Sequence, residues 1–237
     1  MNDQHIVSAF DRDLEAIQAQ IMKMGGLVES AILEAAISLE TRDIERAEAV
    51  RMADKVVDGL EEMINSEAAR VIALRAPTAV DLRLILTVIK VSGNLERIGD
   101  YAKNMAKRTS VLTQMDPVND SAGSLRRMAR EVENMLKDAL DAYIQRDAEL
   151  AKDVIDRDRD LDQMYNALFR EFLTFMMEDP RNITACMHLH FIAKNMERMG
   201  DHVTAIAEQT VYLVTGEKPE EARSKADVTS LPAQQGD

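Results

Sequence analysis

Apolar residues return every three or four positions through most of this chain, which is the spacing of one face of an α-helix. The clearest stretches run from Val91 to Leu112 and from Ile192 to Leu213, where alternating steps of four and three residues predict a buried seam. No stretch of the sequence alternates in the manner of a strand, and proline, glycine and aspartate break the helical pattern at intervals. The breaks predict an all-α protein of six long antiparallel helices, at residues 7–40, 43–75, 79–114, 121–145, 147–178 and 181–215.

The chain repeats itself. Asn94–Tyr101 returns 101 positions later as Asn195–His202, and Ala35–Asp58 aligns in the same way with Ala139–Asp162. Because the matches keep their order, the sequence predicts two tandem, pseudo-symmetric three-helix bundles. We expect the first at residues 1–116, the second at 117–216, and a disordered tail at 217–237, where the chain turns polar and contains two prolines.

Glycine lies inside several of the predicted helices. Gly25 and Gly26 interrupt the first one, where we expect a kink or a weak point. Gly99 and Gly200 occupy matching positions of the repeat, although glycine inside a helix costs up to about 1 kcal/mol relative to alanine. The recurrence of that cost indicates either the close approach of another helix or room for a ligand.

Composition supports the all-α prediction and narrows the range of partners. Aromatic residues make up 4% of the chain, tryptophan is absent, and strong helix formers dominate. With 42 acidic and 29 basic residues the net charge is -13, so nucleic acid and anionic membranes are disfavoured as partners. Cations and basic protein surfaces are the expected partners instead.

Other features of the sequence favour a cytoplasmic protein. Cys186 is the single cysteine, so the chain cannot form an internal disulfide and shows no sign of an oxidising compartment. The first residues lack the basic and apolar regions of a signal peptide. No apolar run reaches the roughly 18 residues that a membrane span needs.

Acidic residues spaced four apart recur at matching positions of the repeat. On a helix this spacing places like charges on one face, where they repel by about 0.2–0.5 kcal/mol per pair. A cation that bridges the carboxylates would turn this repulsion into attraction, and all-oxygen ligands suit hard cations such as Mg²⁺, Ca²⁺, Mn²⁺ or iron. The candidate metal ligands are Asp54, Asp58, Glu96 and Asp100 in the first unit, and Asp158, Asp162, Glu197 and Asp201 in the second.

Helical geometry places the carboxylates of the third and sixth helices, Glu96, Asp100, Glu197 and Asp201, off the apolar seam. Glu197 and Asp201 fall well over 90° from the middle of the seam, so we expect them on the surface or in a shallow groove beside the facing helix. His202 could add a nitrogen ligand in the second unit. The alternative is that the carboxylates are ordinary solvated side chains, or that Arg97 and Arg198 neutralise the neighbouring Glu residues.

The sequence contains no recognised catalytic arrangement, which favours a non-enzymatic adaptor that binds metal and partner proteins. There is no nucleotide-binding, serine-hydrolase or Cys-x-x-Cys motif, and no Glu-x-x-His pair of a di-iron protein. Two alternatives stay open. One is a hydrolase of phosphate esters that uses clustered metal ions, and the other is a purely structural helical scaffold.

The repeated Asn-Leu/Met-Glu-Arg-Ile/Met-Gly-Asp element, the paired Asp-x-x-x-Asp and the segment Ala76–Arg83 resemble the PhoU family of phosphate-signalling regulators, over roughly residues 7–215. The resemblance implies two similar three-helix bundles, often in a homodimer, that bind iron, zinc, magnesium or manganese at these carboxylates. It also implies a negative regulator of the phosphate-starvation response, which links the ATPase subunit of the phosphate ABC transporter to a sensor histidine kinase and modulates phosphate uptake.

The second unit departs from this pattern at one place. After Pro180, the second unit has Arg181-Asn182-Ile183 in place of the Asp81-Leu82-Arg83 element of the first unit. We therefore do not assign this element a role that the two units share.

Overall fold

The computed structural model describes residues 2–118 and 121–217, almost all of them helical. The observed helix boundaries lie within a few residues of the predicted ones, except at the start of the first helix. In the described residues the elements are α1 (Asn2–Thr41), α2 (Ile44–Arg75), α3 (Ala79–Leu112), α4 (Ser121–Gln145), α5 (Ala148–Glu178), a 3₁₀ turn η1 (Pro180–Asn182) and α6 (Ile183–Thr215).

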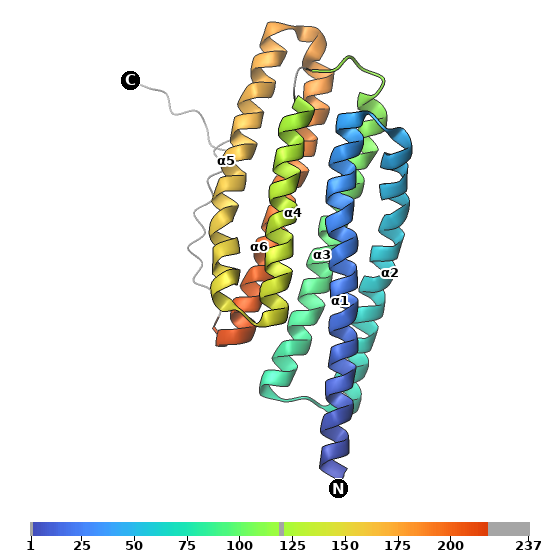
Figure 1. Cartoon of the computed structure of the whole chain (residues 1–237), viewed down its shortest axis with the longest axis vertical. Coiled ribbons are helices and arrows are strands. Elements are labelled where there is room, and N and C mark those ends of the chain that lie inside the picture. Colours follow the sequence, from blue (N-terminus) through green and yellow to red (C-terminus); the bar gives the residue numbers. More distant parts are fainter. Residues whose placement is uncertain (1, 119–120, 218–237) are drawn as a thin grey trace, which may run out of the picture.

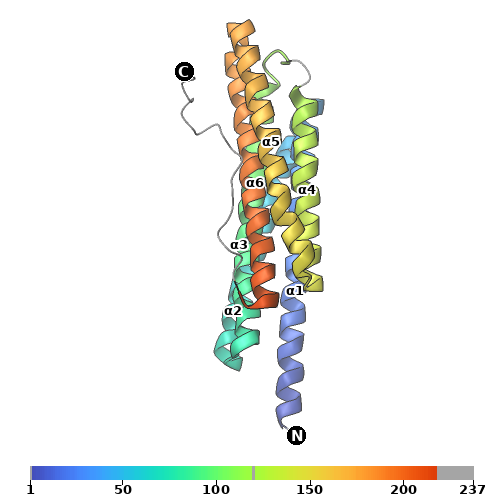
Figure 2. The same ribbon diagram turned by 90° about the vertical axis from the view of Figure 1, so that its left-hand side faces the viewer.

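The helices form two three-helix units that lie side by side with their long axes roughly aligned (Figures 1 and 2). α1, α2 and α3 pack on one another in the first unit, and α4, α5 and α6 do so in the second. α3 packs against α6 and α1 against α4, so the units meet through two matched helix pairs. This arrangement confirms the predicted fold. The tail predicted at 217–237 lies outside the described residues except for Glu217.

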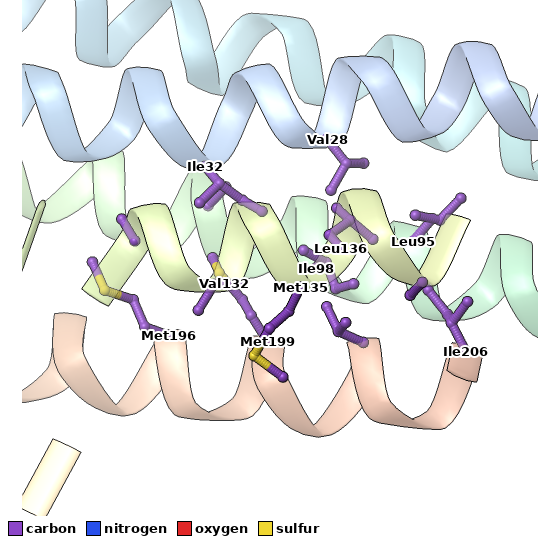
Figure 3. Packing of buried hydrophobic residues seen from close by; sticks show 14 of the residues in the cluster. Val28, Ile32, Leu95, Ile98, Val132, Met135, Leu136, Met196, Met199 and Ile206 are labelled. Carbon is purple, nitrogen blue, oxygen red and sulfur yellow. The ribbon is translucent and has the colours of Figure 1, made fainter. Parts of the chain in front are cut away.

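The predicted seams form the contact between the units. All seven seam positions from Val91 to Leu112 on α3, and all seven from Ile192 to Leu213 on α6, are buried. In Figure 3 apolar side chains of α1, α3, α4 and α6 fill the space between these helices. The buried apolar residues of both units form one continuous cluster, so the two repeats share a core. Among the described helices none is long and apolar enough to cross a membrane.

The repeat extends to backbone conformation at the turn before the second helix of each unit. Arg42 and Arg146 both adopt left-handed conformations, with φ of 56° and 54°. The residues that follow them, Asp43 and Asp147, accept hydrogen bonds from backbone N–H groups in the first turn of α2 and α5. Such a cap contributes about 0.5–2 kcal/mol to stability. The second helix of each unit therefore begins in the same way, with a left-handed arginine followed by an aspartate N-cap.

Gly25 and Gly26 do not interrupt the first helix, because α1 is one helix from Asn2 to Thr41. A Cβ atom placed on Gly25 would lie 2.4 Å from Cδ1 of Leu140 on α4, whereas one placed on Gly26 would meet nothing within 4 Å. Gly25 therefore provides room for α4 to approach α1. The glycine that the pattern marked as a weak point is a point of close packing between the units.

Candidate functional site

The predicted metal ligands lie where the second and third helices of each unit face one another. Asp54 and Asp58 on α2 face α3, which carries Glu96 and Asp100, and the matching four residues lie on α5 and α6. The expectation of a surface or shallow-groove position, made for the carboxylates of the third and sixth helices, is wrong for Glu197, which is 5% exposed. Asp54, Asp158 and Asp162 on the preceding helices are also at most 9% exposed. The reason is that α3 and α6 each bury a second face against the preceding helix, in addition to the apolar seam.

The two repeated glycines lie where these helices face one another, and Gly200 marks the closer approach. A Cβ atom on Gly99 would lie 3.7 Å from Oδ1 of Asp54, and one on Gly200 would lie 3.3 Å from Oδ1 of Asp158. The same added atom on Gly200 would lie only 2.2 Å from Cδ2 of Leu161. In both units the first Asp of the Asp-x-x-x-Asp pair thus points toward the glycine of the opposite helix. Close approach, one of the two explanations offered for the repeated glycine, is confirmed at Gly200, whereas a Cβ atom at Gly99 would meet its neighbours only at ordinary van der Waals distances.

Lys103 joins the two helices of the first unit. Its Nζ atom lies 2.5 Å from Oδ2 of Asp54 on α2 and 3.2 Å from Oδ1 of Asp100 on its own helix. The two carboxylates hold the pKa of the Lys103 ammonium well above its usual value. Lys103 therefore stays charged and supplies one positive charge to a group of four carboxylates.

Lys103 does not balance all the negative charge of the four carboxylates in the first unit, and the pKa values of Asp58 and Glu96 are raised. Burial raises the pKa of Asp58, and the charges of Asp54 and Asp100 add to this effect. Burial also raises the pKa of Glu96, with Asp100 as the next contributor. Arg97 opposes this, since its Nε atom lies 3.5 Å from Oε2 of Glu96. The four carboxylates are thus coupled electrostatically, and one lysine and one exposed arginine do not compensate them fully.

The second unit holds its carboxylates more deeply and uses a different lysine. Nζ of Lys194 lies 3.0 Å from Oε2 of Glu197 and 4.9 Å from the centre of the Tyr165 ring. Asp158 and Asp162 are buried on α5, and Asp201 is half-buried on α6. At the position that matches Lys103 this unit has Thr204, whose hydroxyl donates to the backbone of Gly200. Each unit therefore brings an ammonium group to its carboxylates from a different position.

We call Asp54, Asp58, Glu96 and Asp100 the first carboxylate set, and the matching four residues of the second unit the second carboxylate set. The oxygen atoms of the first carboxylate set are suitable ligands for a cation, although the side chains are not arranged around one point. The buried Oδ1 atom of Asp54 has no hydrogen-bond partner among the described residues, which is costly for a carboxylate oxygen. Among the side chains that the structure describes, however, no three His, Cys, Asp or Glu residues make a group that could hold a metal ion as they stand. Binding would require the side chains of Asp58, Glu96 and Asp100 to turn toward Asp54. The eight predicted ligands stay a prediction.

His202, which the sequence offered as a nitrogen ligand, contacts the other unit. Its Nδ1 atom lies 2.8 Å from Oδ1 of Asn94 on α3, and its ring lies 5.7 Å from the ring of Tyr101. Tyr101 and His202 occupy matching positions of the repeat, so equivalent residues of the two units meet near the pseudo-symmetry axis. These residues stabilise the contact between α3 and α6.

The two lysines beside the carboxylates were not predicted from the sequence. The signal was present, because Lys103 follows Asp100 by three residues and Lys194 precedes Glu197 by three, which are spacings of neighbours on a helix. It was missed because Lys103 and Lys194 do not match each other in the repeat.

Relatives resemble this chain over nearly its whole length. A "Phosphate-specific transport system accessory protein PhoU homolog" from Caulobacter vibrioides (strain NA1000 / CB15N) is 45% identical over 227 residues, which cover 96% of this chain and 99% of the relative. A protein of the same name from Rhizobium meliloti (strain 1021) is 42% identical over 237 residues, which cover 97% of each chain.

Solved structures agree with the sequence matches. The crystal structure of PhoU from Pseudomonas aeruginosa has a TM-score of 0.85 at 37% identity, covering 88% of this chain and 100% of that chain. That of the phosphate transport system regulatory protein PhoU from Streptococcus pneumoniae has a TM-score of 0.82 at 28% identity, covering 89% and 99%. Two segments of this chain, residues 21–109 and 125–210, each match the PhoU domain. On these matches, the chain belongs to the PhoU family.

Proposed function

We propose that this chain is an accessory protein of a phosphate transport system and a negative regulator of the phosphate-starvation response. The observation on which this rests is similarity over nearly the full length to relatives that bear the accessory-protein name. In this proposal the chain links the ATPase subunit of a phosphate ABC transporter to a sensor histidine kinase in the cytoplasm, and it modulates phosphate uptake. It acts by binding these partners and not by catalysis.

We further propose that the protein works as a homodimer and binds iron, zinc, magnesium or manganese between α2 and α3 and between α5 and α6. Support comes from the charges: two helices of each unit bring four carboxylates to one place, and they do so at matched positions. A bound cation would remove the repulsion that raises the pKa of Asp58 and Glu96. Metal here would neutralise charge and fix the spacing of the two helices that carry the carboxylates.

The regulatory part of the proposal is tested in cells of the source bacterium. A strain without this gene, grown in high phosphate, is expected to express its phosphate-scavenging genes as if starved, and a plasmid copy of the gene is expected to restore repression. The measurement is a transcriptional reporter compared at high and low phosphate. Unchanged repression in the deletion strain would contradict the regulatory role.

The metal part is tested on purified protein. Elemental analysis after exposure to Mn²⁺ or Fe²⁺ and dialysis is expected to find metal in the natural chain and at least tenfold less in the variant Asp100→Ala with Asp201→Ala. The matched control is Asp156→Ala with Asp160→Ala, which removes two exposed carboxylates spaced four apart on α5 and should leave the metal content unchanged. Equal metal in both double variants would exclude the predicted sites.

A further inference from the structure

The ammonium group of Lys103 already occupies a position between carboxylates of the first set. Nζ of Lys103 lies 2.5 Å from Oδ2 of Asp54 and 3.2 Å from Oδ1 of Asp100, so one ammonium group connects α2 to α3. A metal ion bound by the same oxygens would sit about 2.0–2.6 Å from them. An ammonium nitrogen and a metal ion cannot share that volume, and their like charges would repel. Lys103 and a metal ion therefore compete for the same two carboxylates.

The need for this ammonium follows from the burial of Asp54. Its side chain is 4% exposed, and a buried carboxylate without a compensating charge destabilises the fold strongly. The Lys103 side chain is 40% exposed at the end of a flexible four-carbon stem, so it can turn into water when another cation arrives. Lys103 is thus positioned to hold the helices together without metal and to leave when metal binds.

The two units place their lysines differently. Thr204 of the second unit stands at the position of Lys103, and Gly93 of the first unit stands at the position of Lys194. In the first unit Lys103 connects carboxylates of two helices, whereas in the second unit Lys194 pairs with Glu197 on its own helix.

We propose that Lys103 is a built-in counter-ion of the first carboxylate set, which a metal ion must displace in order to bind there. Lys103 then sets the metal concentration at which the first unit loads, independently of the second unit. The inference rests on the proposed metal binding and adds to it the residue that limits the affinity of one of the two sets.

The test uses Mn²⁺ titration by isothermal calorimetry on the full chain with Asp201→Ala, which weakens the second set. Lys103→Gln in this background is expected to raise the affinity for Mn²⁺ at least tenfold, because the competing charge is removed. The control Lys107→Gln removes an exposed lysine one turn further along α3 and is expected to change nothing.

Thermal unfolding gives a second measurement that does not depend on the shape of a binding curve. Without metal, Lys103→Gln is expected to melt below the Lys107→Gln control, and Mn²⁺ should raise its melting temperature by more than it raises that of the control. Equal affinity for Mn²⁺ with and without Lys103 would overturn the inference and leave the metal sites standing. Absence of binding in every variant would overturn both, whereas binding only after Lys103→Gln would support the displacement directly.

Discussion

Substitution of Leu95 by alanine is expected to destabilise the entire molecule by about 2–5 kcal/mol, and not the first unit alone. Leu95 is fully buried on the seam where α3 packs against α6, and the residue at the matching position of the second unit, Met196, is buried on the same seam. Removal of three side-chain carbon atoms here leaves a cavity between the units. The loss therefore falls on the core that both units share.

The measurement is urea denaturation combined with hydrogen exchange followed by mass spectrometry, which resolves α2 in one unit and α5 in the other. We expect one cooperative transition, with exchange accelerated by the same factor in both helices. The control is Leu86→Ala on the same helix, where the side chain is 46% exposed, and this change should cost less than about 0.5 kcal/mol. Faster exchange in α2 with no change in α5 would show that the repeats unfold independently.

The fold followed from the sequence because its signals are local and repeated. Spacing of apolar residues located the seams of α3 and α6, and aspartate caps located the starts of α2 and α5. The role of Gly25 could not be predicted in this way, because the partner of that glycine is Leu140, more than a hundred residues away. A tertiary contact of this kind has no signature in the local pattern, and tertiary context decided whether the glycine bent the helix or packed it.

The site was predicted less completely than the fold. Spacing on one helix identified Glu96 with Asp100 as a pair, and the repeat added the other pairs. The burial of Glu197 could not be predicted from its angular distance to the apolar seam of α6. The positions of residues around α6 do not show that α5 covers the side of the helix that carries Glu197. The cross-helix ion pair of Lys103 with Asp54 depends on the register of α2 against α3, which neither helix encodes by itself.

The close approach of α5 to α6 beside the second carboxylate set depends on Gly200. Replacement of Gly200 by valine is therefore expected to lower the free energy of unfolding by about 1–3 kcal/mol. A Cβ atom at this position would lie 2.2 Å from Cδ2 of Leu161 and 3.3 Å from Oδ1 of Asp158. Leu161 is buried, so it cannot turn into solvent to avoid the new side chain, and α5 must move away from α6.

The control is Gly93→Val on α3, where an added Cβ atom would meet nothing within 4 Å. Because valine is the better helix former, this change should be neutral or stabilise by a few tenths of a kcal/mol, roughly. Urea denaturation gives both free energies, and Mn²⁺ titration of the same samples tests the site. If the separation of α5 from α6 sets the site geometry, Gly200→Val should weaken Mn²⁺ binding while Gly93→Val leaves it unchanged. Stability equal to that of the natural chain would mean that Leu161 repacks within the core and that the repeated glycine is not needed for the approach of the helices.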